Sequence, residues 1–223
     1  MPDQVQIVAG DGHCFNVYKA VKPGNTRWVV VVQEAFGVNA HIRSLCDRFA
    51  EQGFNAIAPA LFDRVERDVE MDYTAASVAR YMKLREQMKK EDVLTDLMAA
   101  ADNTGSSKVG IVGYCFGGTA TWWAATSLDR FAAASCWYGG GIFAEKDLQP
   151  RCPVQMHFGA LDAHIPLAQV EAIRAAQPAV EIHLYDGADH GFGCDSRPSF
   201  HAESYQLALD RTTSFLGAHL QVD

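Results

Sequence analysis

The segment KVGIVGYCFGGTATWWAATS, residues 108–127, constrains the fold more than any other part of the chain. It begins with a short apolar run, passes through a group of glycines around Cys115 and continues with a helical pattern. A strand followed at once by a helix needs a sharp turn, whose central residue is held in a strained conformation. Gly113 and Gly117 lie two residues on either side of Cys115, where any side chain would push the helix away from the strand. The segment therefore predicts a buried strand, a tight turn at Cys115 and a helix.

The same alternation of short apolar runs and longer amphipathic segments continues along the chain. The run Arg27–Glu34 contains four consecutive valines and is typical of a strand buried on both faces. We expect further strands within residues 54–59, 108–114, 131–140, 153–162 and 180–192, and helices within residues 41–53, 75–103 (one helix or two), 169–177 and 204–220. This order predicts an α/β fold with a mostly parallel sheet and helices on both faces, in one domain spanning residues 1–223.

Charge and composition argue against several classes of partner. The formal net charge of −8 argues against nucleic acid and against anionic membranes. The start of the chain lacks a signal-peptide pattern, and no apolar run approaches the roughly 20 residues of a membrane span. The six cysteines are scattered without a CxxC pair, so they indicate neither a zinc ribbon nor a thioredoxin-type site. We expect a cytoplasmic protein whose thiols stay reduced.

Cys115 occupies the position that serine takes in the G-x-S-x-G turn of α/β-hydrolases. At the start of a helix, the helix dipole would favour its thiolate. A cysteine nucleophile also needs a base and an acid that orients the base, and in this fold both follow later strands in the order nucleophile, acid, base. Asp162 and His190 stand in that order and at those places. The alternative is a buried cysteine, a turn aspartate and a surface histidine, but all three coinciding in order is less expected by chance.

Two backbone N–H groups would hold the negative charge that develops on a substrate carbonyl oxygen. Phe116 directly follows the nucleophile, and Ala35 lies in the loop after the valine strand, which is where this fold takes its second donor. Glu34 is unusual at the end of such a strand; it is either a solvated strand end or a carboxylate close to the nucleophile. His157, His164 and His183 have no cysteine or carboxylate at ligand spacing, so we interpret them as structural and expect neither a metal nor a cofactor.

These motifs resemble the dienelactone hydrolase (carboxymethylenebutenolidase) family. QEAFGVN, GYCFGG, HFGALDAHIP and YDGADHGF stand in the family's order, and the two ends of the chain resemble it as well. The resemblance implies an α/β-hydrolase fold without a separate cap domain and a triad of Cys115, Asp162 and His190. It implies that Glu34 partners the resting thiol and takes part in its activation. It also implies hydrolysis of dienelactones, which are carboxylated enol lactones from the degradation of chlorinated aromatic compounds.

One position departs from the family pattern. Cys194 stands four residues after the predicted base, where the best-known members carry an arginine that binds the substrate carboxylate. Arg197 follows three residues later and is one candidate for that role, together with Phe36 in the early loop. A second arginine is expected before or within the long helical segment; Arg80 is our candidate, and Arg64, Arg67 and Arg85 are the others.

The sequence thus predicts a small ester or lactone substrate, which can be carboxylated, and a monomer or a small homo-oligomer. The reaction would pass through an acylated Cys115, that is, a thioester. Two alternatives stay open. The first is a carboxylesterase of broader specificity, and the second is a thiol redox sensor on the same fold, for which no resolving CxxC partner is visible.

Overall fold

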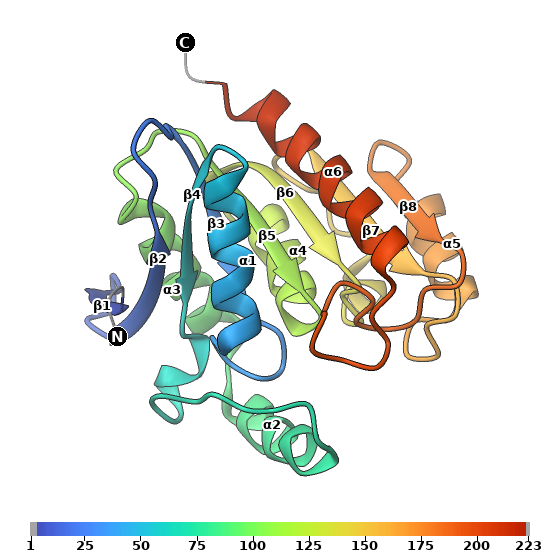
Figure 1. Ribbon diagram of the computed structural model, residues 1–223, viewed down its shortest axis with the longest axis horizontal. Helices are drawn as coiled ribbons and strands as arrows, with labels where there is room; N and C mark the ends of the chain where they lie inside the picture. The colour runs from blue at the N-terminus through green and yellow to red at the C-terminus, as the bar shows by residue number, and fades with distance from the viewer. Residues whose placement is uncertain (1–3, 222–223) are drawn as a thin grey trace.

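The computed structural model describes residues 4–221 and centres on one eight-stranded sheet (Figure 1). The strand order is β1-β2-β4-β3-β5-β6-β7-β8. The first two strands and the β2–β4 pair run antiparallel, and all the other neighbours are parallel. The strand bounds are β1 Gln4–Val8, β2 Cys14–Ala20, β3 Arg27–Val32, β4 Phe54–Pro59, β5 Val109–Tyr114, β6 Phe131–Trp137, β7 Val154–Gly159 and β8 Glu181–Tyr185.

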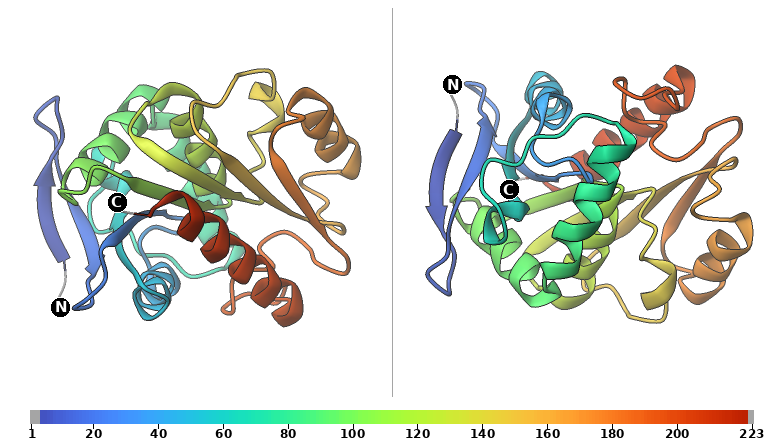
Figure 2. Two further views of the ribbon diagram at one scale, coloured as in Figure 1. Left: turned by 90° about the horizontal axis from the view of Figure 1, so that it is seen from above. Right: turned by 90° about the horizontal axis from the view of Figure 1, so that it is seen from below.

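Helices cover both faces of the sheet, as the alternating pattern predicts. Figure 2 shows α1 and α6 on one face and α3 and α4 on the other, while α5 lies near β8 at the far edge. The helix bounds are α1 Ala40–Glu51, α2 Ala75–Gln87, α3 Lys90–Asp102, α4 Phe116–Ser127, α5 Leu167–Ala176 and α6 Ala202–His219. None of the helices in residues 4–221 is long and apolar enough to cross a membrane.

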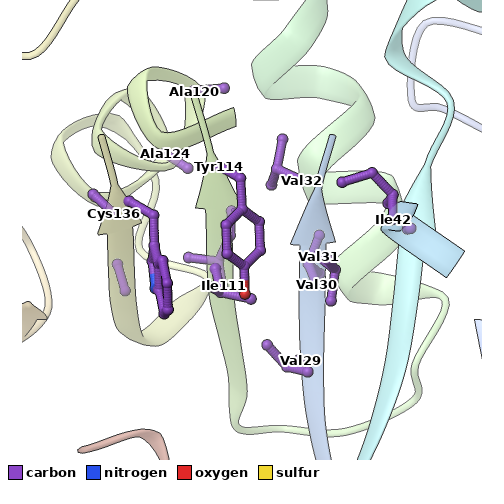
Figure 3. Packing of buried hydrophobic residues seen from close by; sticks show 14 of the residues in the cluster. Val29, Val30, Val31, Val32, Ile42, Ile111, Tyr114, Ala120, Ala124 and Cys136 are labelled. Carbon is purple, nitrogen blue, oxygen red and sulfur yellow. The ribbon is translucent and has the colours of Figure 1, made fainter. Parts of the chain in front are cut away.

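The core forms where the central strands are covered from both sides. Val29 to Val32 of β3 are fully buried, and in Figure 3 they lie beside Ile111 and Tyr114 of the neighbouring strand β5. Ile42 of α1 packs from one side of β3. Strands enclosed in this way lose the alternation of polar and apolar residues, which explains the continuous valine run.

The N-terminal hairpin was not anticipated from the sequence. β2 buries only about every second residue, because it lies near the edge of the sheet, and β1 carries the exposed Val5 and Val8. The long helical segment divides into α2 and α3, because Met88 adopts an extended backbone conformation (φ −81°, ψ 134°).

The carboxyl ends of β3, β5, β7 and β8 meet at one edge of the sheet, because these strands run parallel. In open α/β sheets, ligands bind at this edge. Figures 1 and 2 show α2 lying across it. The described residues contain no separate cap domain there; α2 extends over the strand ends.

Candidate active site

The turn at Cys115 has the geometry that its glycines predict. Cys115 takes φ 55° and ψ −115° at the N-cap of α4, and its N–H donates to the Trp137 carbonyl oxygen of β6 at 3.0 Å. A Cβ atom on Gly113 would lie 2.1 Å from the carbonyl oxygen of Gly117, and one on Gly117 would lie 2.3 Å from that of Val32. Both distances are far below van der Waals contact, so the turn requires glycine at these two positions.

The fold brings together the three side chains that the sequence predicts as a triad. His190 Nε2 lies 3.2 Å from Cys115 Sγ, and His190 Nδ1 lies 2.8 Å from Asp162 Oδ2. The second oxygen of Asp162 accepts the backbone N–H groups of His164 at 2.8 Å and of Ile165 at 3.2 Å. These bonds fix the carboxylate, which in turn fixes the plane of the imidazole.

The surroundings of the imidazole favour its protonated form. Burial lowers the pKa of His190, but hydrogen bonds to Asp162 and Cys115 outweigh this and raise the pKa to about 10. For Asp162, burial acts to raise the pKa, but the bond to His190 prevails and the pKa falls below its ordinary value. These contacts favour the imidazolium, the form of His190 that can give a proton to an oxygen beside the sulfur.

Both predicted oxyanion donors lie at the cavity beside Cys115. Phe116 is the first residue of α4, and the N–H groups of a first helical turn have no partner within the helix. Ala35 follows β3 by three residues and lines the same cavity. The cavity has a volume of about 410 Å³, which suits a small organic substrate.

Two of the five candidate arginines line this cavity. Arg197 and Arg85 do so, whereas Arg80 points away from it on the exposed side of α2 and forms an ion pair with Glu66. Arg64 pairs with Asp96, and Arg67 donates to a backbone carbonyl of β2. The second arginine at the cavity is thus Arg85 and not Arg80, because residues five apart on a helix point in different directions.

The two cavity arginines are positioned by aromatic rings. The Arg85 guanidinium lies 5.5 Å from the Phe116 ring centre and 5.3 Å from that of Trp123. The Arg197 guanidinium lies 5.9 Å from the ring centre of Phe36 and 6.0 Å from a second ring, that of Tyr73. Phe36, predicted as a substrate-binding residue, lines the cavity and also supports Arg197.

Glu34 is buried beneath the cavity wall. Its Oε1 accepts a long hydrogen bond of 3.4 Å from the Tyr138 hydroxyl and lies 3.9 Å from Arg197 Nη1. Its side chain is only 1% exposed. Neither of these contacts joins Glu34 to Cys115. The family role of Glu34 as partner of the thiol therefore stays a prediction.

One histidine that the sequence suggested to be structural lies at the cavity. His164 is exposed and lines the rim, with its ring 5.2 Å from that of His190 at an angle of 74°. Its position two residues after Asp162 could have indicated that it lies at the cavity, because one loop carries both residues. His157 is buried and bonds to Gln155 and Tyr185, away from the cavity, which fits a structural role.

Comparison with known proteins identifies the family of the chain. The family model described as "Dienelactone hydrolase family" matches residues 15–220. A Synechocystis protein named "Putative carboxymethylenebutenolidase" is 37% identical over 99% of this chain and 96% of its own length. A Yersinia pestis protein of the same name is 34% identical over 86% of this chain and 78% of its own length.

Solved structures agree on the fold. A structure titled "Putative Dienelactone Hydrolase" from Klebsiella pneumoniae has 32% identity and a TM-score of 0.83, covering 96% of this chain and 97% of its own. A dienelactone hydrolase-like promiscuous phosphotriesterase from metagenomic libraries has 20% identity and a TM-score of 0.78, and shows the shared architecture. The predicted α/β-hydrolase fold is confirmed, and the chain belongs to the dienelactone hydrolase family.

Proposed function

We propose that this protein hydrolyses small esters or lactones by acyl transfer through Cys115. The single observation that carries the proposal is the Cys115–His190–Asp162 chain, with contacts of 3.2 Å and 2.8 Å, which opens onto a cavity at the carboxyl edge of the sheet. A sulfur at the start of a helix, beside a protonated imidazole, is activated as a thiolate nucleophile. The names of the family relatives support the same class of reaction.

In the first half of the reaction, the Cys115 thiolate attacks the carbonyl carbon and forms a carbon–sulfur bond. The carbonyl electron pair moves to oxygen, where the N–H groups of Ala35 and Phe116 stabilise the charge. When the pair returns, the carbon–oxygen bond of the ester breaks. The leaving oxygen takes the proton from His190 Nε2, so the alcohol or enol departs neutral.

In the second half, His190 is a neutral base. It removes a proton from a water molecule that attacks the thioester carbonyl, and the same two N–H groups hold the second oxyanion. Collapse breaks the carbon–sulfur bond, which returns Cys115 as thiolate and His190 as imidazolium. Asp162 stays ionised throughout and keeps Nδ1 protonated, so Nε2 is always the nitrogen that exchanges the proton.

The cavity favours a substrate with a carboxylate. Arg85 and Arg197 bring two positive charges to a cavity whose other walls are largely apolar, in a protein of net charge −8. Two guanidinium groups match the planar geometry of a carboxylate. The substrate class that fits is therefore a carboxylated lactone or ester, with the carboxylate near the arginines and the reacting carbonyl at Cys115.

The test measures hydrolysis of a dienelactone and of p-nitrophenyl esters by the parent, by Cys115→Ala and by Cys136→Ser. Loss of the nucleophile is expected to lower kcat/KM by about 10⁴-fold or more, while Cys136→Ser, a buried thiol in β6, retains activity. Mass spectrometry of the quenched parent should show an acyl adduct on Cys115. Hydrolysis that persists in Cys115→Ala would refute the assignment.

The substrate class is tested separately. Arg85→Gln should raise KM for the carboxylated lactone by about tenfold to 100-fold, which matches the loss of one charge-assisted hydrogen-bond pair. KM for an uncharged p-nitrophenyl ester should change little. Arg80→Gln is the matched control on the same helix, because its side chain faces Glu66. Equal effects on both substrates would indicate an esterase without carboxylate selectivity.

A further inference from the structure

A second group of reactive side chains lies buried beside the candidate active site. Glu34 follows β3, His41 stands in the first turn of α1, and Cys194 lies in the loop after the predicted base. One carboxylate oxygen, one ring nitrogen and the sulfur of these residues all lie within 4.8 Å of one another. All three residues are buried, with 1%, 4% and 0% of their surface exposed.

Two of these atoms lack the hydrogen bonds that buried polar atoms normally have. Within residues 4–221, neither Glu34 Oε2 nor His41 Nε2 has a hydrogen-bond partner. Leaving one buried polar atom unpaired typically costs about 1–3 kcal/mol, and more for a charged group. Two unpaired atoms on residues whose ligand atoms lie this close to a thiol indicate a ligand that accepts electron pairs from all three residues.

The other nitrogen of His41 has the partner that histidine ligands of metals commonly have. His41 Nδ1 lies 3.2 Å from Asp195 Oδ1, and Arg48 pairs with the second oxygen of Asp195. A carboxylate at Nδ1 favours the tautomer in which Nδ1 carries the proton. Nε2 then presents its lone pair to the cluster, as in carboxylate–histidine–zinc arrangements.

We propose that Glu34 Oε2, His41 Nε2 and Cys194 Sγ form a binding site for a zinc ion. A set of one sulfur, one imidazole nitrogen and one carboxylate oxygen suits Zn²⁺ and does not suit Mg²⁺ or Ca²⁺, which take oxygen ligands. Tetrahedral zinc sites with these bond lengths place ligand atoms roughly 3.3–3.7 Å apart. Side-chain shifts of about an ångström would close the observed spacing.

The charges of the cluster fit a divalent ion. Binding would displace the Cys194 thiol proton, so a thiolate and the Glu34 carboxylate would together balance the two charges of Zn²⁺, while the Arg197 cation stays at the partly exposed cavity wall. Tyr73 lies beside Cys194, and Arg197 lies 3.9 Å from Oε1 of Glu34, the oxygen that the ion would not use. Three protein ligands leave one coordination position for solvent.

The proposal concerns metal binding alone and does not depend on the hydrolytic function. Cys194 stands at the position where the family resemblance led us to expect an arginine. This chain therefore has a side chain that can bind a metal there, in place of a cationic one. Glu34 and the adjacent Arg197 join the site to the cavity, because Arg197 lines the cavity wall.

The test is a titration of reduced protein with Co²⁺, an absorbing substitute for Zn²⁺. Because Cys115 and His190 are themselves a sulfur–nitrogen pair, the titration uses the Cys115→Ser protein. One Co²⁺ per chain should bind and give a near-ultraviolet thiolate-to-cobalt charge-transfer band, which Zn²⁺ then displaces. Adding Cys194→Ser should abolish the band, and Glu34→Gln or His41→Asn should weaken binding at least ~10-fold.

The matched control is Cys136→Ser in the same background, another fully buried thiol that should leave the band unchanged. Asp195→Asn, which changes the group that contacts His41 Nδ1 and pairs with Arg48, should weaken binding by about 10-fold or more. Circular dichroism and thermal unfolding without metal show that each variant is folded. Absence of the band, or a band that survives Cys194→Ser, would overturn the proposal.

Discussion

Asp96 and Glu34 are both buried carboxylates that face an arginine, but their environments differ. Asp96 of α3 is bound by Arg64 through two bonds, from Nε at 2.8 Å and Nη2 at 2.7 Å, so both of its oxygens are used. Glu34 has a 3.4 Å bond from Tyr138 and lies 3.9 Å from Arg197, while its second oxygen has no hydrogen-bond partner among the described residues.

The difference separates a stabilising ion pair from a functional candidate. A bidentate arginine pair offsets much of the cost of moving two charges out of water. Glu34 lacks that compensation, so its burial costs stability. Natural proteins tolerate such costs mainly at functional sites. Glu34 lies next to the candidate active site and in the proposed zinc site, and Asp96 lies in neither.

A buried carboxylate whose two oxygens are both hydrogen-bonded can still serve catalysis, and Asp162 is the case that tests this. It is bonded as fully as Asp96, but its partner is the proposed base His190. Asp162→Asn should lower kcat by about 10³–10⁴-fold, because the amide favours the wrong imidazole tautomer. Steady-state hydrolysis of a p-nitrophenyl ester measures the loss. Asp96→Asn should keep most of the activity at temperatures where it is folded; an equal loss in both variants would remove the distinction.

Asp96→Asn should lower the free energy of unfolding more than Glu34→Gln does. The substitution leaves the Arg64 guanidinium, only 14% exposed, without its bidentate partner. Breaking a buried pair costs about 3–5 kcal/mol; we expect about 3 kcal/mol, because Asp11 still faces Arg64 at 2.7 Å. Urea denaturation measures the free energy of unfolding. A change below about 1 kcal/mol would show that the pair contributes little.

The pH dependence of stability measures how strongly the Asp162 site holds a proton on His190. Folding raises the pKa of His190 from 6.5 to about 10, since the bonds to Asp162 and Cys115 outweigh burial. Its contribution to stability is therefore complete below pH 6.5 and is lost as the pH rises toward 10. The difference in unfolding free energy between the parent and His190→Gln should fall by about 1 kcal/mol between pH 7 and 8. A difference that grows with pH would contradict the assignment.

Glu34→Gln should have the smallest effect on stability. The amide removes a poorly compensated charge, and little pairing with Arg197 is lost, because its Nη1 lies 3.9 Å from Glu34 Oε1 and makes no hydrogen bond to it. The free energy of unfolding should rise or stay within about 0.5 kcal/mol of the parent value. The same urea experiment provides the comparison with Asp96→Asn. A loss as large as that of Asp96→Asn would mean that Glu34 stabilises the fold.

Much of the architecture could be predicted from periodicity. The central strands are continuous apolar runs because both of their faces are covered, and this made β3, β4 and β5 recognisable. The hairpin β1–β2 was missed, because β2 buries only about every second residue and β1 lies at the edge of the sheet, so both strands carry a weaker apolar pattern. The break between α2 and α3 was left open, since no glycine or proline marks Met88.

The sequence by itself determined the turn at Cys115 and the order in which Asp162 and His190 follow it. Glycines are required by local sterics, and parallel strands carry their following loops to one edge of the sheet. Only the tertiary structure decided that Arg85 and not Arg80 reaches the cavity, because packing sets the rotation of α2. It alone brought Cys194 beside Glu34 and His41. That contact joins segments far apart in the sequence, and no local sequence pattern in either segment indicates that they meet.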